Sequence, residues 1–143
     1  MTDRRGLFAA LAAGLLPQAA GAAPPDVPDQ VFNPEQAKIT QESFGELLIY
    51  FTGSTGQLGL LETGRVILNP GATPHPPHQH PEEELLLVTE GAGEISIDGK
   101  IHASGPGAMM YCAANRLHGI VNTGRTPLTF YFVKWDKQGQ AGA

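Results

Sequence analysis

The sequence has a single cysteine, Cys112, so no disulfide can form within the chain. Basic residues are also scarce: there are 9 Lys and Arg against 14 Asp and Glu, which gives a formal net charge of −5. Because nucleic acids are bound through clusters of Lys and Arg, this balance argues against nucleic acid as a partner. No run of apolar residues reaches the length of about 18 that a membrane-spanning helix needs. We therefore expect no stable membrane insertion.

The first 22 residues have the composition of an export signal. A charged start with Arg4 and Arg5 precedes an apolar run from Leu7 to Leu16, and an Ala-x-Ala sequence ends at Ala22. The arginine pair resembles a twin-arginine signal, which exports proteins that have already folded. The lack of a cysteine pair fits folding before export. We therefore expect a signal peptide over residues 1–22 and a mature protein that is periplasmic or secreted.

Glycine and proline, in contrast, are abundant, with 18 and 12 copies. Short runs of apolar, β-branched or aromatic residues follow one another from Phe44 and alternate with turn sequences such as "NPGATP" and "NTGRTP". This pattern predicts an all-β antiparallel sandwich or barrel. We place the barrel at residues 44–136, after a proline-rich linker or N-terminal arm at residues 23–43 and before a flexible tail at residues 137–143.

A histidine-rich segment, "HPPHQHPEEELLLV", leads into one of these strands. His78, His80 and Glu84 have the same parity, so in extended backbone their side chains would project from one face. The flanking prolines favour such extended backbone. Two imidazoles and a carboxylate form a mixed nitrogen and oxygen site, which suits Fe, Mn, Ni, Co, Cu or Zn better than Ca or Mg.

The spacing of this segment resembles the first motif of the cupin superfamily. That motif places His-x-His and then Glu between two glycines, and here His78, His80 and Glu84 lie between Gly71 and Gly91. Among the three consecutive glutamates, Glu84 is the one at the required distance from Gly91.

A second stretch resembles the second cupin motif. Gly107 is followed by a short strand, then by His118, and Asn122 comes four residues later. Ala113 and Asn115 depart from the family pattern, because they stand where a Pro-x-Gly turn is usual. We expect Asn122 to stabilise the turn after the strand.

The resemblance implies a double-stranded β-helix, that is, a small jelly-roll barrel. It also implies that four side chains point into the barrel and hold one divalent transition metal: His78, His80, Glu84 and His118. Fe or Mn is favoured, because a protein that folds before export takes its metal in the cytoplasm, whereas a site filled outside would take Cu or Zn. Zn, Ni, Cu and Co remain alternatives.

Further side chains are candidates for the surroundings of the metal. His75 either lies directly behind the ligands or is a solvated loop histidine. Arg116 has the parity of His118, so it either reaches the cavity and binds a carboxylate or forms a surface salt bridge. Three neighbours either line a substrate pocket or fill the core: Met110, Tyr111 and Cys112.

Two classes of function fit this sequence. One is a mononuclear metalloenzyme acting on a small organic molecule, either dioxygenase-like or a Lewis-acid isomerase, decarboxylase or lyase. The other is a non-catalytic protein whose metal organises a pocket for a sugar or an organic acid, since the fold hosts both classes.

The apolar runs "ELLLV" and "FYFVKW" exceed what one barrel interior needs. We therefore expect a homodimer.

Overall fold

Nine β-strands and one 3-10 helix make up residues 26–137, the part of the chain that the computed structural model describes. The predicted signal peptide at residues 1–22 lies outside this part, as do residues 138–143 of the predicted tail. The helix and the strands have the following bounds: η1 (Pro34–Gln36), β1 (Ile39–Glu42), β2 (Gly45–Gly53), β3 (Leu58–Leu68), β4 (Glu83–Glu90), β5 (Gly93–Ile97), β6 (Lys100–Ser104), β7 (Met109–Cys112), β8 (His118–Val121) and β9 (Leu128–Lys137).

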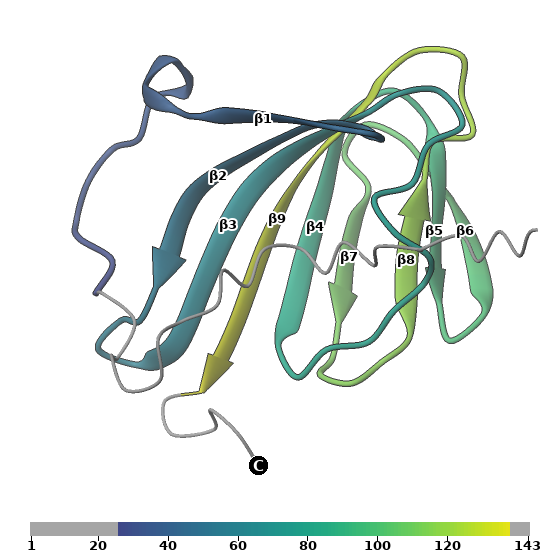
Figure 1. Cartoon of the computed structure of the whole chain (residues 1–143). Coiled ribbons are helices and arrows are strands. Elements are labelled where there is room, and N and C mark those ends of the chain that lie inside the picture. Colours follow the sequence, from purple (N-terminus) through teal and green to yellow (C-terminus); the bar gives the residue numbers. More distant parts are fainter. Residues whose placement is uncertain (1–25, 138–143) are drawn as a thin grey trace, which may run out of the picture.

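The strands form two sheets. The larger sheet has the order β1-β2-β3-β9-β4-β7 and the smaller has the order β6-β5-β8. Figure 1 shows the smaller sheet on the far side of the barrel from β2 and β3. β9, the last strand in the sequence, lies between β3 and β4 and is antiparallel to both. This interleaving of antiparallel strands confirms the predicted all-β fold, a jelly-roll double-stranded β-helix.

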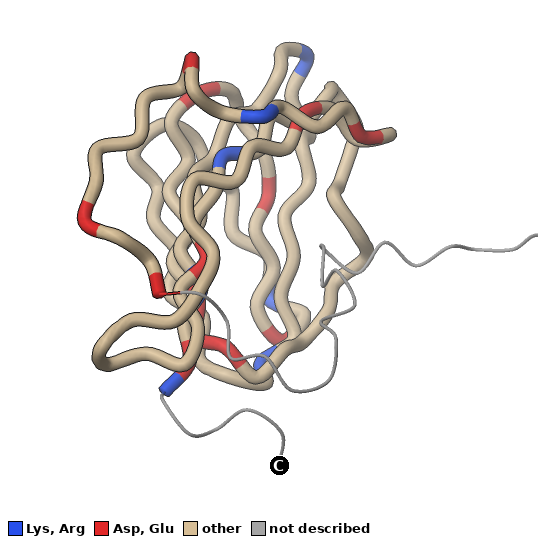
Figure 2. The backbone as a smooth tube through the Cα atoms, turned by 60° about the vertical axis from the view of Figure 1, so that its left-hand side comes forward, with Lys and Arg blue, Asp and Glu red and all other residues tan. Residues whose placement is uncertain are grey.

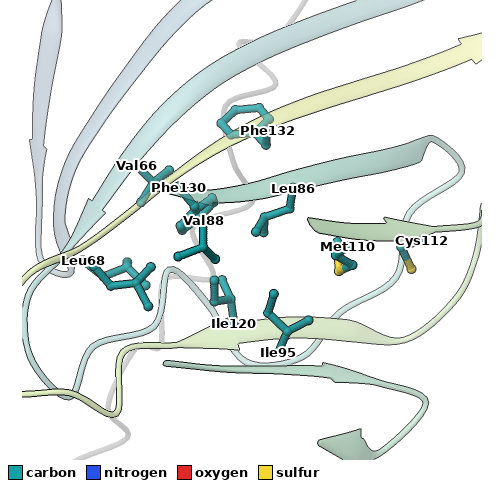
Figure 3. Packing of buried hydrophobic residues seen from close by; sticks show 11 residues of the cluster. Val66, Leu68, Leu86, Val88, Ile95, Met110, Cys112, Ile120, Phe130 and Phe132 are labelled. Atoms are coloured by element: carbon teal, nitrogen blue, oxygen red, sulfur yellow. The ribbon is translucent and has the colours of Figure 1, made fainter. Parts of the chain in front are cut away.

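The core lies between the two sheets (Figure 3). Leu86 and Val88 of β4 and Phe130 of β9 are buried on its larger side, and Ile95 and Ile120 are buried on the smaller side. These residues alternate along their strands with less buried ones, which is the pattern of a sheet with one face in the core. The large sheet thus aims its inner face at β5 and β8.

The proline-rich segment is an arm that packs on the sheet edge. β1 extends the sheet by pairing with β2, so the sheet begins at Ile39, five residues before the predicted start of the barrel. Val27 N–H donates to the Ser54 carbonyl at 2.8 Å. The ring of Phe32 lies edge-on to Tyr50, with centroids 5.4 Å apart.

Charged residues are dispersed over the surface. Along the part of the backbone that the structure describes, Figure 2 shows basic positions scattered among acidic ones rather than gathered in a continuous basic stretch. This distribution agrees with the argument against nucleic acid as a partner. Within residues 26–137, no helix has the length and the hydropathy that crossing a membrane requires.

Candidate metal centre

The histidine-rich segment is held against β8 by backbone hydrogen bonds. His78 N–H donates to the His118 carbonyl at 2.9 Å, and His118 N–H donates back to the His78 carbonyl at 2.9 Å. Asn115 N–H donates to the His80 carbonyl at 2.7 Å. The prolines of the segment have no N–H to donate, so it lies along β8 as an irregular edge rather than as a regular strand. This pairing brings the two histidine motifs together.

Asn122 closes the other end of β8 and is completely buried. Its Nδ2 donates to the carbonyls of Leu68 at 3.0 Å and Thr126 at 2.9 Å, and its Oδ1 accepts from Gly124 N–H at 2.9 Å. The predicted role in the turn after the strand is thereby confirmed. The side chain also ties that turn to β3 of the large sheet.

Two of the histidines meet at one carboxylate oxygen. Glu84 Oε2 lies 3.1 Å from His80 Nε2 and 2.9 Å from His118 Nε2. The other nitrogen of each ring faces a carbonyl: His80 Nδ1 is 3.1 Å from the Glu82 oxygen, and His118 Nδ1 is 2.8 Å from the Arg116 oxygen. Because a carbonyl oxygen only accepts, each Nδ1 carries the hydrogen and donates. When the rings are neutral, each Nε2 therefore carries no hydrogen, and its lone pair faces the Glu84 oxygen.

Three acceptor atoms at this spacing need a cation between them. The cation is either a proton on an imidazole or a metal ion. Histidines that bind metals characteristically donate their second ring N–H to a backbone carbonyl or a carboxylate, which fixes the tautomer and the ring orientation. His80 and His118 both have this support, so the donor set has the arrangement that a metal ion requires.

His78 completes the cluster. Its ring centroid lies 5.1 Å from that of His80 and 4.7 Å from that of His118. Its Nδ1 is buried and has no hydrogen-bond partner among the described residues. Leaving such a group unpaired costs about 1–3 kcal/mol, so a ligand at this nitrogen would offset that cost.

The three histidines are positioned to hold one metal ion. One ligand nitrogen from each lies within 4.8 Å of the other two. Donors on opposite sides of one ion, with bonds of about 2.1 Å, would be roughly 4.2 Å apart. A small inward movement of the rings therefore suffices, and a Glu84 oxygen lies beside two of the three, His80 and His118.

The charge states of the cluster also suit a metal ion. Burial by itself raises the pKa of Glu84, but hydrogen bonds from His118 and His80 outweigh it and lower that pKa to about 2. Burial, followed by the neighbouring imidazoles of His75, His118 and His80, lowers the pKa of His78 to about 4. At neutral pH Glu84 is therefore ionised and His78 is neutral, which are the states in which both bind metals.

His118 behaves differently because it faces the carboxylate directly. Burial lowers its pKa, but the hydrogen bonds with Glu84 and with the Arg116 carbonyl raise it more, so the net pKa lies above the usual value. Without a metal, a proton on His118 can thus fill the place of the cation.

Two of the predicted surrounding residues lie away from the cluster. Arg116 is exposed and its Nη1 donates to Asp98 Oδ2 at 2.8 Å, so the surface salt bridge is the alternative that the structure shows. Tyr111 is 54% exposed and its hydroxyl donates to Glu83 Oε1 at 2.6 Å, so it does not line a pocket around the histidines.

The other predicted residues lie closer to the cluster. Met110 and Cys112 are both buried in the core, and Cys112 is directly opposite Glu84 in the pairing of β4 with β7. His75 stacks edge-on against His78, with ring centroids 3.7 Å apart. Of the two alternatives for His75, the structure therefore shows the one directly behind a ligand.

The sequence reading missed two charged residues near the site, Lys134 and Glu62. They form an ion pair of 2.9 Å whose two side chains are each 16% exposed. Lys134 is directly opposite Glu84 in the pairing of β4 with β9. The available signal was the polar Lys134 within the otherwise apolar run "FYFVKW", in phase with the buried Phe130 and Phe132.

The fold and the site together define a jelly-roll protein with a histidine-rich centre. Residues 64–134 match the family described as Cupin domain. This match supports the predicted relationship to the cupin superfamily. No curated protein matches the sequence.

Several solved structures resemble this one. An RmlC-like cupin from Shewanella frigidimarina has a TM-score of 0.64 at 18% identity, covering 82% of this chain and 97% of that one. A predicted oxalate decarboxylase from Thermotoga maritima has a TM-score of 0.61 at 21% identity, covering 74% and 98%. A sugar phosphate isomerase from Silicibacter pomeroyi has a TM-score of 0.50 at 31% identity, covering 54% and 51%. At these identities the first two show the fold alone.

Removing a ligand should empty the site. We predict that His78→Ala or His118→Ala lowers the metal content of the purified protein well below one ion per chain. His102→Ala is the matched control, because His102 is exposed on β6 and its replacement should leave the metal content unchanged.

Metal at about 100 times its dissociation constant should add about 2.7 kcal/mol to the free energy of unfolding. That corresponds to on the order of 10 °C in melting temperature for a domain of this size. A melting curve that a chelator does not move would contradict the assignment.

Acid should release the metal. Imidazoles bind metals only when neutral, so protons compete as the pH falls towards about 6. His118, with its raised pKa, should take up a proton first, whereas His78 should do so only near its pKa of about 4. We expect occupancy to fall steeply below about pH 6, with more than one proton bound per ion released. Metal analysis after dialysis across this range measures it. Full occupancy at about pH 4 would contradict a site built on these histidines.

Proposed function

We propose that this cupin is an exported mononuclear metalloenzyme acting on a small organic molecule. The observation that carries the proposal is the convergence of His80 Nε2, His118 Nε2 and Glu84 Oε2, three acceptor atoms with no hydrogen of their own in the neutral rings. A divalent transition metal at this point, with Fe or Mn favoured, would supply Lewis acidity or a site for dioxygen. Zn, Ni, Cu and Co remain alternatives.

The protein's own groups would prepare such a centre. The carbonyls of Glu82 and Arg116 fix the tautomers of His80 and His118, so both rings present Nε2 to the interior. The side chain of Glu82 adds a second acceptor, 3.1 Å from His80 Nδ1. The apolar core adjoins the site, since its Cys112 is directly opposite Glu84 in the pairing of β4 with β7. These contacts hold the ligands in place before a substrate arrives.

The reaction is dioxygenase-like or is a Lewis-acid isomerisation, decarboxylation or elimination. The name of one structural neighbour, the sugar phosphate isomerase that is 31% identical over 54% of this chain, supports the second group. The test is a substrate screen on metal-loaded protein. Oxygen uptake is followed with catechols, flavonols and diketones, carbon dioxide release with oxalate, and isomerisation with sugar phosphates.

A positive reaction should be lost in His118→Ala and kept in His102→Ala. Metal-loaded protein that turns over none of these compounds but binds some of them would instead show a non-catalytic binding protein for sugars or organic acids. That outcome would contradict the enzymatic proposal while leaving the metal site intact.

We also propose a homodimer formed through the outer face of the large sheet. Leu87 and Met109 are opposite each other on this face, and Tyr131 is the neighbour of Leu87 on β9. We expect Met109→Glu to shift the protein towards monomer, because the charge would be buried in the contact. Ile101→Glu is the control, since Ile101 is 62% exposed on the small sheet and Met109 is 64% exposed. Light scattering at tens of micromolar measures the mass. A monomeric wild type would refute the dimer.

The export route is proposed to decide which metal enters. A protein that folds in the cytoplasm can keep Fe or Mn, whereas an empty site filled outside would take Cu or Zn. We predict that protein matured through its own signal carries Fe or Mn. Metal content is compared in three preparations. The first is the protein exported through its own signal, the second is its variant with Arg4→Lys and Arg5→Lys, and the third is the same domain fused to a signal that exports unfolded proteins. Equal metal in all three, or normal export of the lysine variant, would overturn the link.

A further inference from the structure

A line of polar side chains crosses the inner face of the large sheet at the level of Glu84. Glu62 of β3 is opposite Lys134 of β9, and Lys134 is in turn opposite Glu84 of β4. Directly opposed residues in antiparallel strands project to the same face, with Cβ atoms about 5 Å apart. Glu84 reaches His118 of the small sheet, so this face is the interior. Lys134 and Glu62 therefore point into the barrel beside the histidine cluster.

Lys134 is the basic residue of this line, and its ammonium is held in place. Nζ lies 2.9 Å from Glu62 Oε1 and 5.8 Å from the centroid of the Phe132 ring. Among the described residues, no ion pair joins Lys134 to Glu84, so the ammonium leans towards β3 and away from the ligand carboxylate. Both side chains are 16% exposed, so the pair keeps some contact with solvent.

The ion pair is hard to explain by stability alone. A paired charge inside a protein loses hydration, and apolar side chains of the same size often stabilise a fold equally well or better. Phe132 and Leu86 fill the next inward row with apolar groups, so the strands tolerate such residues here. An inward-facing lysine and its carboxylate partner beside a metal site are therefore more useful for binding than for folding.

We propose that Lys134 is a substrate-binding residue that receives the ionised oxygen of a small organic acid held at the metal centre. The acid would place one oxygen at the histidine cluster and its carboxylate near the Lys134 ammonium. Without the acid the ammonium pairs with Glu62, and its contact with the acid is a charge-assisted hydrogen bond. This inference rests on the proposed metal function and narrows its substrate class to organic acids.

The surrounding charges favour a singly charged anion over a dianion, because Glu84, Glu62 and Asp136 are acidic and Lys134 is the one basic residue of this line. Glu84 offsets half of the charge of a divalent ion, and Glu62 offsets that of Lys134. Asp136 faces the same way two residues further along β9, and its buried Oδ1 has no hydrogen-bond partner among the described residues. That oxygen is an acceptor, so it favours a ligand that also carries a hydroxyl. A 2-hydroxy acid has both groups.

Lactate and lactamide test this inference, because they have the same size and the same hydroxyl and differ in charge. Protein loaded with cobalt is titrated with each compound, and the visible absorption of the cobalt reports binding. In Lys134→Met we expect lactate to bind at least about tenfold more weakly, the usual loss for one charged hydrogen bond. Binding of lactamide and the cobalt content should stay as in the wild type. Lys137→Met, at an exposed lysine of the same strand, is the control.

Two further variants separate binding from structure. Lys134→Arg keeps the charge and should retain most of the lactate affinity. Glu62→Gln removes the carboxylate that competes for the Lys134 ammonium, so lactate affinity should stay the same or rise. If the ion pair only stabilised the fold, both Lys134→Met and Glu62→Gln should weaken lactate binding. The role of Lys134 would be overturned if Lys134→Met weakened lactate and lactamide binding equally, or did not weaken lactate binding at all. It would also be overturned if the cobalt-loaded wild type did not bind lactate. Failure to load any metal would overturn the proposed function itself.

Discussion

The site depends on the two backbone hydrogen bonds between His78 and His118. They join the histidine-rich segment to β8, a strand of the smaller sheet that begins 40 residues later in the sequence. With that pairing in place, the alternation of extended backbone directs His80 and Glu84 to the same interior point. The proline residues limit the other conformations open to the segment, so less entropy is lost when the ligands gather. The prolines of the segment and its hydrogen bonds with β8 together set the geometry of the site.

The electrostatics follow from that geometry. Once Glu82 and Arg116 carbonyls occupy the two Nδ1 atoms, the inward nitrogens can only accept, and so can the Glu84 oxygen. In the absence of a metal, a proton on His118 relieves this conflict, which is why its pKa is raised. A metal ion relieves it for all the ligands at once. Metal binding, proton binding and folding are therefore linked at the same few atoms.

The sequence predicted the parts of the site that depend on local spacing. Strand runs, turn residues and the two motifs identified the fold and the clustered His and Glu residues. For Arg116 parity left two alternatives, and the surface salt bridge is the one observed, because Arg116 lies in the loop before β8 begins at His118. Tyr111 shares a strand with the buried Met110 and Cys112, and the face of each residue followed only from the register with β4. The phase of Lys134 with Phe130 and Phe132 could place it on the inner face, but its proximity to Glu84 could not be predicted, because that arises from strand pairing across 50 residues.

The central claim is that one metal ion is bound where His78, His80, His118 and Glu84 converge. X-ray absorption spectroscopy of the protein, purified without added chelator, tests it most directly, together with anomalous diffraction at the edge of the bound metal. The account predicts a single ion in the barrel with imidazole nitrogens and one carboxylate oxygen at about 2.0–2.2 Å. A metal-free interior with His118 protonated against Glu84, or an ion bound elsewhere, would contradict it.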